Sequence, residues 1–366
     1  MKTWKRLLPP ILALGLVAGL ASCSLLEQAG APPDISASPS EGVEPTESTG
    51  LPEGLDLEAA YLDPVVLEEV NVADEAVALA EAPAAVPTAL MPVASGEKVK
   101  SNSRAIIDYS NTKDGYVMVK FTGTTRTKIK VQIAGPSYAS SKLIYTYDLL
   151  VGEWTTFALS DGNGQYKVTV LENTSGNKYA QVLTKTFQVS MTDEFAPFLR
   201  PNQYVNYESA PNTVVKAEEL AGDKPDLLLK VERIYNYVVK NLTYDGQRAA
   251  DAVAGRINGY LPVLDSVLKE QKGICFDYAA LMTGMLRAQG VPCKLVTGYV
   301  PTGDGTAYHA WISVWSSETG WVEGAIYFDG SAWQRMDPTF ASTGNSSALI
   351  MQYIGNGSNY TPRFFY

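Results

Sequence analysis

From residue 103 to residue 190 the chain alternates apolar and polar residues in short runs, separated by turn residues such as Gly, Asn and Asp. Alternation of this kind is typical of β-strands with one buried face, and closely spaced strands are typical of antiparallel sandwiches. The pattern therefore predicts an immunoglobulin-like β-sandwich over residues 101–192. Its strands are expected at Ala105–Tyr109, Tyr116–Phe121, Lys128–Ile133, Leu143–Leu149, Trp154–Leu159, Tyr166–Leu171 and Tyr179–Val189.

This predicted sandwich carries no signal of catalysis. It contains neither histidine nor cysteine, and its aromatic residues are expected in the core and between neighbouring strands. We interpret it as a spacer or as a binding module, and both interpretations stay open.

Beyond residue 193 the spacing of apolar residues changes to every three or four positions, which is typical of amphipathic helices. Helices are predicted at Asp226–Lys240, Pro262–Glu270 and Phe276–Gln289, and Gly290 is suited to end the last of them. Strands are expected afterwards at Cys293–Val300, His309–Val314, Ile326–Phe328 and Trp333–Asp337. Helices followed by strands indicate an α+β domain over residues 193–366, so the chain is predicted to be multidomain.

The N-terminus has the features of a secretory signal over residues 1–22. Basic residues at positions 2, 5 and 6 precede an apolar run from Leu7 to Leu20, which is shorter than the roughly 20 residues that span a bilayer. The segment Leu20-Ala21-Ser22-Cys23 resembles a bacterial lipoprotein box, in which cleavage leaves the cysteine as the lipidated first residue. We expect Cys23 to anchor the chain to a membrane, outside the cytoplasm.

Residues 23–100 are predicted to form a disordered tether. The segment is rich in Pro, Ala, Glu, Ser and Gly, and residues 24–100 hold 15 acidic and 2 basic side chains. Such a composition cannot bury enough apolar surface to offset the entropy of ordering. The net charge of −10 therefore belongs to the tether, since the acidic and basic residues of positions 101–366 balance.

Composition limits the chemistry of the folded part. A chain without a basic surface is a poor partner for nucleic acid. His309 is the one histidine among 366 residues, and three cysteines cannot form a disulfide framework. A His-rich metal site is excluded, and neither a metal nor a cofactor is expected.

Three short segments carry residue types that suit nucleophilic catalysis. Cys275 follows Gly273 at the expected start of a helix, where free N–H groups stabilise a thiolate. His309 opens a predicted strand, and Asp337 closes a later one. If they converge, the imidazole serves as the base and the carboxylate fixes its tautomer.

Together these segments resemble the transglutaminase-like superfamily of papain-related thiol enzymes. The resemblance covers Val215–Phe340. Five segments carry it: Gly273-Ile274-Cys275-Phe276-Asp277-Tyr278-Ala279-Ala280-Leu281, Leu286-Arg287-Ala288-Gln289-Gly290-Val291-Pro292, Val296-Thr297-Gly298-Tyr299, His309-Ala310-Trp311 and Asp337-Pro338-Thr339. Two lead-in segments upstream also match: Ile234-Tyr235-Asn236-Tyr237-Val238 and Leu242-Thr243-Tyr244-Asp245. It implies a papain-like domain with Cys275 as nucleophile, His309 as base and Asp337 as the orienting group. Tyr244, or the backbone N–H of Cys275, is expected to bind the oxyanion.

Two positions depart from the simplest form of the resemblance. Cys293 follows Val291-Pro292, and the intervening helix spans roughly 20 Å at 1.5 Å per residue, so we expect a buried thiol and no bond to Cys275. Trp315–Ile326 is expected as a loop inserted before a turn at Tyr327–Trp333. The rim of the site would then include Trp311, Trp321 and Glu323.

The resulting hypothesis is a lipid-anchored enzyme that transfers acyl groups from peptide or protein amides through a thioester. Water as acceptor would make it a peptidase or amidase, and an amine as acceptor would make it a transglutaminase. A second hypothesis is a catalytically silent module that binds peptide or cell-wall material. A third assigns the function to the sandwich, as an adhesion module.

Overall fold

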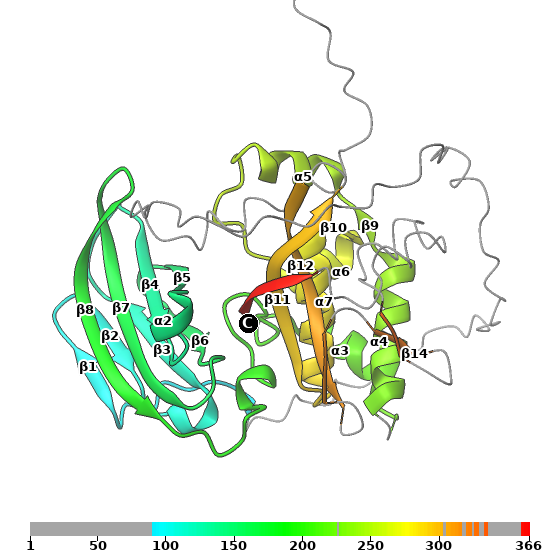
Figure 1. Ribbon diagram of the computed structural model, residues 1–366, viewed down its shortest axis with the longest axis horizontal. Helices are drawn as coiled ribbons and strands as arrows, with labels where there is room; N and C mark the ends of the chain where they lie inside the picture. The colour runs from blue at the N-terminus through cyan, green and yellow to red at the C-terminus, as the bar shows by residue number, and fades with distance from the viewer. Residues whose placement is uncertain are drawn as a thin grey trace, which may run out of the picture.

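The computed structural model describes residues 90–224, 227–302, 305–316, 320–323, 326–328, 333–335 and 360–366. Two units lie next to each other: a β-rich unit drawn in cyan and green, and a second unit in which helices cover a sheet (Figure 1). The expectations for residues 1–22, for Cys23 and for Asp337 lie outside the described residues.

The first unit consists of two four-stranded antiparallel sheets, in the orders β1-β2-β3-β6 and β5-β4-β7-β8. All seven predicted strands are present, and the immunoglobulin-like topology stays a prediction. The inward side chains of both sheets are apolar and buried in one cluster, as alternation along each strand requires. The elements are β1 (Val99–Ser101), β2 (Ala105–Asp108), β3 (Tyr116–Phe121), β4 (Ile129–Ala134), α2 (Tyr138–Ser141), β5 (Tyr145–Leu149), β6 (Trp154–Ala158), β7 (Gly164–Ser175) and β8 (Lys178–Val189).

The folded part begins earlier than the predicted boundary at residue 100. The amide of Val93 donates to Tyr116 Oη at 3.1 Å, and the amide of Gly96 donates to Asp108 Oδ2 at 2.7 Å. Strand β1 then pairs with β2 from Val99 onward. Residues 93–100 therefore contact the first unit, which the polar residues around Gly96 did not indicate.

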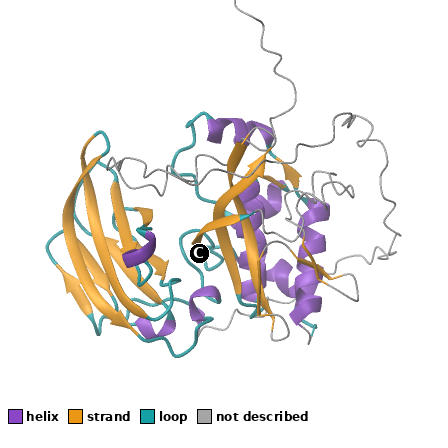
Figure 2. Cartoon of the chain, viewed as in Figure 1, coloured by secondary structure: helices purple, strands orange, loops and turns teal. Residues whose placement is uncertain are grey.

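The second unit is built around one buried helix, α7 (Cys275–Ala288). Helices α3 (Pro211–Ala221), α4 (Leu227–Asn241) and α6 (Leu264–Glu270) pack on it, and so do strands β11 (Cys293–Thr302) and β12 (Gly305–Ser316). All fourteen residues of α7 are buried. The helices gather on the side of the sheet that faces away from the first unit (Figure 2).

The main sheet of this unit has the order β13-β12-β11-β16. Its outer strands are β13 (Gly320–Glu323) and β16 (Thr361–Phe365), and two short pairs lie elsewhere: β9 (Thr243–Tyr244) with β10 (Lys272–Gly273), and β14 (Ile326–Phe328) with β15 (Trp333–Arg335). Helix α5 (Gly246–Val253) follows β9. The second unit therefore combines helices with a substantial β-sheet, as expected for an α+β domain.

The predicted loop insertion at Trp315–Ile326 is wrong for its described part. Strand β12 continues to Ser316 and forms a hairpin with β13, in which Trp315 lies opposite Trp321. Gly320 has a φ of +70°, a value suited to glycine at such a reversal. Cross-strand pairing of two large aromatic residues stabilises a hairpin. Strands β14 and β15, which flank the turn expected between Tyr327 and Trp333, pair antiparallel, and the residues between them lie outside the described residues.

Aromatic side chains join the two units. The ring of Tyr145 in β5 lies 5.0 Å from that of Phe364 and 5.7 Å from that of Tyr366, between centroids. Tyr204, in the linker, lies 5.5 Å from Tyr147 and 4.4 Å from Tyr366. Strand β16, drawn in red, therefore lies at the junction (Figure 1). Among the described residues, no helix has the length and apolar character needed to cross a membrane.

Candidate active site

Cys275 is the first residue of α7, as predicted. The free N–H groups of a helix start and the helix dipole favour a negative charge there. Gly273 is required just before it, because a Cβ at this position would lie 2.4 Å from Cβ of Asp277. The local sequence thus lets the Asp277 side chain fold back beneath the helix start.

Asp277 connects the helix start to its surroundings through three hydrogen bonds. Its carboxylate accepts from the amide of Ile274 at 2.8 Å, from Tyr260 Oη at 2.6 Å and from Arg248 Nη1 at 3.2 Å. The side chain of Asp277 is fully buried. The carboxylate therefore fixes the residue that precedes Cys275 against two side chains from outside α7.

The charges around Asp277 oppose the cost of its burial. Burial raises the pKa of the Asp277 carboxyl, while the hydrogen bonds from Tyr260 and Ile274 and the charge of Arg248 act in the opposite direction. Arg248 itself contacts Asp245 at 3.7 Å, and the amide of Arg248 donates to that carboxylate at the start of α5. Helix α5 thus positions the arginine that pairs with Asp277.

The thiol of Cys275 is not exposed. The residue is fully buried. Cys293 is a free, buried thiol, so no disulfide joins it to Cys275, as the sequence predicted. The Sγ of Cys293 donates to Thr283 Oγ1 at 3.5 Å, and burial raises its pKa to about 11.

His309 lies in the middle of β12, whereas the sequence placed it at the strand's start. Its ring is 6.4 Å from that of Trp311 and 6.5 Å from that of Tyr360, between centroids, and the residue is 5% exposed. Trp311 and Tyr360 belong to a cluster separate from the core that holds Cys275. The imidazole is therefore enclosed by aromatic rings.

Alternation along β12 decides which side His309 faces. Cys293 contacts Thr283 of α7, and Cys293 lies opposite Val314 of β12. The even-numbered residues of β12 therefore face α7, and His309 lies on the other face of the sheet. Helix α7 and strand β12, which carry Cys275 and His309, pack against each other.

The predicted oxyanion donor lies in strand β9, and two of the predicted rim residues lie in strand β13. Tyr244 is half-buried and lies opposite Gly273 in the β9–β10 pair, two residues before Cys275. Trp321 packs on Phe198, with 5.2 Å between centroids, at the junction with the first unit. It lies opposite Trp315, roughly 20 Å along β12 from His309. Glu323 lies opposite Ser313 in β13.

Several residues near the site were not singled out from the sequence. Asp277 was part of the quoted motif but had no assigned role, and nothing in the sequence pairs it with Arg248 or Tyr260. Tyr360 adjoins a strand that the sequence did not predict. Among the described residues, no group of three His, Cys, Asp or Glu side chains is arranged to hold a metal ion.

Comparison with known proteins identifies a family resemblance over this unit. Residues 215–338, about a third of the chain, match the model of the transglutaminase-like superfamily. A protein-glutamine gamma-glutamyltransferase of Pseudomonas aeruginosa is 34% identical over 68 residues, which cover 16% of this chain and 10% of that protein. An uncharacterized protein of Mycobacterium leprae is 30% identical over 121 residues, 30% of this chain and 36% of that protein. The chain thus spans well under half the length of these relatives.

Solved structures show distant similarity. The periplasmic domain of TgpA from Pseudomonas aeruginosa is 14% identical, with a TM-score of 0.29 over 67% of this chain and 99% of that domain. Red sea bream transglutaminase is 13% identical, with a TM-score of 0.25 over 61% of this chain and 48% of that protein.

Proposed function

Residues 215–338 belong to the transglutaminase-like superfamily, and on this premise we propose that the chain is a thiol acyl-transfer enzyme acting on peptide or protein amides. Cys275 is the nucleophile, His309 the base and Asp337 the group that orients the imidazole. The observation that carries the proposal is the place of Cys275 as first residue of the buried helix α7. A cysteine at a helix start is stabilised as the thiolate that attacks a carbonyl.

The proposed reaction has two steps. Cys275 Sγ attacks the amide carbonyl carbon, the C–N bond breaks, and the imidazolium of His309 delivers its proton to the departing amine. This leaves a thioester on Cys275. Water or a primary amine then attacks the thioester carbonyl, His309 takes the proton of the attacking group, and the thiolate is released. Tyr244, or the N–H of Cys275, is the proposed oxyanion donor.

The observed state of Cys275 sets a condition on this reaction. Because the cysteine is fully buried, its sulfur must become accessible to substrate before it can attack. The imidazole must then reach the sulfur from the far face of β12.

Covalent labelling tests the proposal. The reduced full chain is treated with a peptide chloromethyl ketone, digested and mapped by mass spectrometry, with Cys275→Ala as the control. We expect one label, on Cys275, and none in the variant. Absence of label on native reduced protein would favour a silent module that binds peptide or cell-wall material, an alternative that the burial of Cys275 supports.

The acceptor is determined in a second assay. A glutamine-containing peptide is incubated with and without a primary amine such as cadaverine, and the masses of the products are measured by mass spectrometry. Release of ammonia without amine incorporation indicates an amidase, and cleavage of the chain indicates a peptidase. A mass gain equal to cadaverine minus ammonia indicates a transglutaminase.

We also propose that the chain acts outside the cytoplasm, anchored to a membrane through lipidated Cys23. The basic start, the short apolar run and the Leu20-Ala21-Ser22-Cys23 segment support this location. Metabolic labelling with a fatty acid tests it, since Cys23→Ala should abolish incorporation and release the chain from the membrane fraction.

A further inference from the structure

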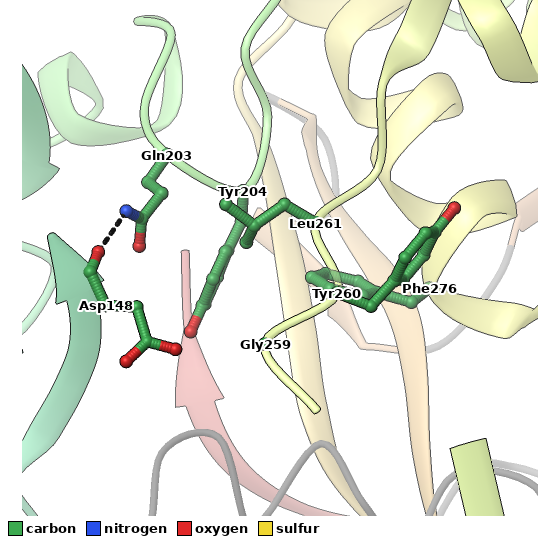
Figure 3. A pocket seen from close by; sticks show the side chains of 7 residues that line it. All are labelled: Asp148, Gln203, Tyr204, Gly259, Tyr260, Leu261 and Phe276. Carbon is green, nitrogen blue, oxygen red and sulfur yellow. Dashed lines mark hydrogen bonds between the residues drawn. The ribbon is translucent and has the colours of Figure 1, made fainter. Parts of the chain in front are cut away.

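A small pocket lies between the two units, beside the first turn of α7. It is lined by one residue of β5, two linker residues, three residues before α6 and one residue of α7: Asp148, Gln203, Tyr204, Gly259, Tyr260, Leu261 and Phe276. Figure 3 shows the Asp148 carboxylate on one side and the rings of Tyr260 and Phe276 on the other. The first unit thus contributes a charged group next to the residue that follows Cys275.

The carboxylate of Asp148 has unused hydrogen-bonding capacity. Its Oδ1 is buried, and within the described part of the chain no donor lies within hydrogen-bond distance. Lys130 Nζ forms an ion pair with Oδ1 at 3.9 Å, which is too far for a hydrogen bond. Burying a charged oxygen without a donor is costly, so a ligand that brings an N–H donor would offset this cost.

The opposite wall consists of aromatic rings. Tyr204 and Phe276 lie 5.4 Å apart between centroids in an edge-on arrangement, and Tyr260 completes the wall. Faces of aromatic rings attract cations. A carboxylate facing such rings is a combination that favours an ammonium group over a neutral or anionic one.

The size of the pocket limits the ligand. Its cavity volume is about 20 Å³, which is room for one water-sized group. Gly259, with a φ of +80°, keeps the Asp148 side uncovered, since a Cβ there would lie 3.1 Å from Asp148 Oδ2. A primary ammonium head fits this space, while a fully methylated ammonium does not.

Charges behind the aromatic wall add to this preference. Tyr260 donates to Asp277, and the surrounding ion-pair cluster holds three acids and two bases: Asp245, Glu270 and Asp277 with Arg248 and Lys272. The cluster is therefore net negative.

From this geometry we propose that the pocket is a subsite for a primary ammonium group of the substrate, bound by Asp148 against Tyr204, Tyr260 and Phe276. The inference rests on the proposed function for its catalytic meaning: the substrate class becomes peptides that carry a free ammonium near the amide attacked by Cys275. The ammonium can come from a peptide N-terminus or from a lysine side chain. The first unit then takes part in substrate selection.

Binding is tested without turnover. The full chain labelled with [15N]glycine is titrated with ethylammonium, and the amide resonance of Gly259 is followed by NMR. We expect a saturable shift, weakened at least threefold by Asp148→Asn. The matched control Glu153→Gln removes an exposed acid of the same unit that does not line the pocket, and it should bind like the parent chain. Tetramethylammonium should produce no shift.

Two further probes distinguish a peptide N-terminus from a lysine side chain as the source of the ammonium group. Glycinamide presents an α-ammonium and Nα-acetyl-lysine amide presents an ε-ammonium, and N-acetylglycinamide serves as the uncharged control. Binding of either amine, weakened by Asp148→Asn, supports the subsite and identifies the source by the tighter probe. Equal binding by Asp148→Asn, a shift with tetramethylammonium, or no shift with any amine would overturn the inference.

The outcome is independent of the proposed enzyme activity. If amines bind but Cys275 is never labelled, the subsite stands and the enzyme proposal fails. If the chain turns over amides, Asp148→Asn should raise KM for a substrate with a free amine while kcat stays unchanged. An unchanged KM would contradict the subsite and leave the nucleophile in place.

Discussion

The carboxylate of Asp277 accepts a hydrogen bond of 2.8 Å from the amide of Ile274, the residue immediately before Cys275. The same carboxylate also accepts from Tyr260 and Arg248. One buried side chain thus orients the start of α7 relative to α5 and to the segment that lines the pocket at the junction.

Replacing Asp277 by alanine is expected to lower the free energy of unfolding by about 3 kcal/mol, because Arg248, Tyr260 and the Ile274 amide lose a buried partner. Urea unfolding of the reduced chain measures the change. Asp223→Ala is the control: this acid pairs with Lys224 but is 73% exposed, and loss of an exposed pair should cost about 1 kcal/mol or less. Equal losses in both variants would contradict the role of Asp277.

The raised pKa of Cys293 predicts a pH dependence of stability. Burial raises this pKa from 9.0 to about 11, so the unfolded chain loses the thiol proton at lower pH than the folded chain. The stability that the buried, protonated thiol contributes is fully present below pH 9 and is lost as the pH rises towards 11. Between pH 8 and pH 10.5 the loss should be about 2 kcal/mol.

The comparison that isolates this effect is urea unfolding of the parent chain and Cys293→Ala at both pH values, with reductant present. Between these pH values the free energy of unfolding of the parent chain should fall by about 2 kcal/mol more than that of the variant. Iodoacetamide should also leave Cys293 unlabelled in the folded chain at pH 8 and modify it after denaturation. Rapid labelling in the folded chain would show that the thiol is not buried.

Arg287 is predicted to hold β16 in place. This fully buried guanidinium donates from Nε to the carbonyl of Cys293 at 2.9 Å, from Nη1 to that of Arg200 at 2.8 Å and from Nη2 to that of Tyr366 at 2.5 Å. Arg287→Met leaves carbonyls without donors and should cost about 2–4 kcal/mol. The exposed Arg233 of α4 supplies the control, Arg233→Met.

Hydrogen exchange locates the effect of that substitution. The amide of Tyr366 donates to Leu295 at 2.8 Å, and its protection should fall in Arg287→Met more than the protection of amides in β7. A uniform loss across both units would show that Arg287 stabilises the chain as a whole and does not specifically hold this strand.

Strong periodicity made part of the fold predictable. The apolar residues of α4, α6 and α7 recur at helical spacing, and the sandwich strands alternate with turn residues between them. Helix α3 was missed although Pro211 stands at its first turn, a position where proline is common. Strand β16 contains Pro362, a residue that weakens a strand prediction and is tolerated at a sheet edge.

The candidate site was less predictable than the fold because its geometry depends on distant residues. The position of Cys275 at a helix start followed from Gly273 and the apolar spacing after it. The partners of Asp277 did not, since Arg248 and Tyr260 precede it by 29 and 17 positions. The face on which His309 lies depends on the register of β12, which a single strand's pattern does not determine.

The central claim is that His309 activates the thiol of Cys275. The most direct measurement is the rate at which iodoacetamide alkylates Cys275 in the reduced full chain as a function of pH, for the parent and for His309→Gln. We expect the parent rate to persist well below the ordinary thiol pKa of about 8.5, and the variant's inflexion to move upward with at least about a tenfold loss of rate at pH 6. Superimposable profiles would contradict the account.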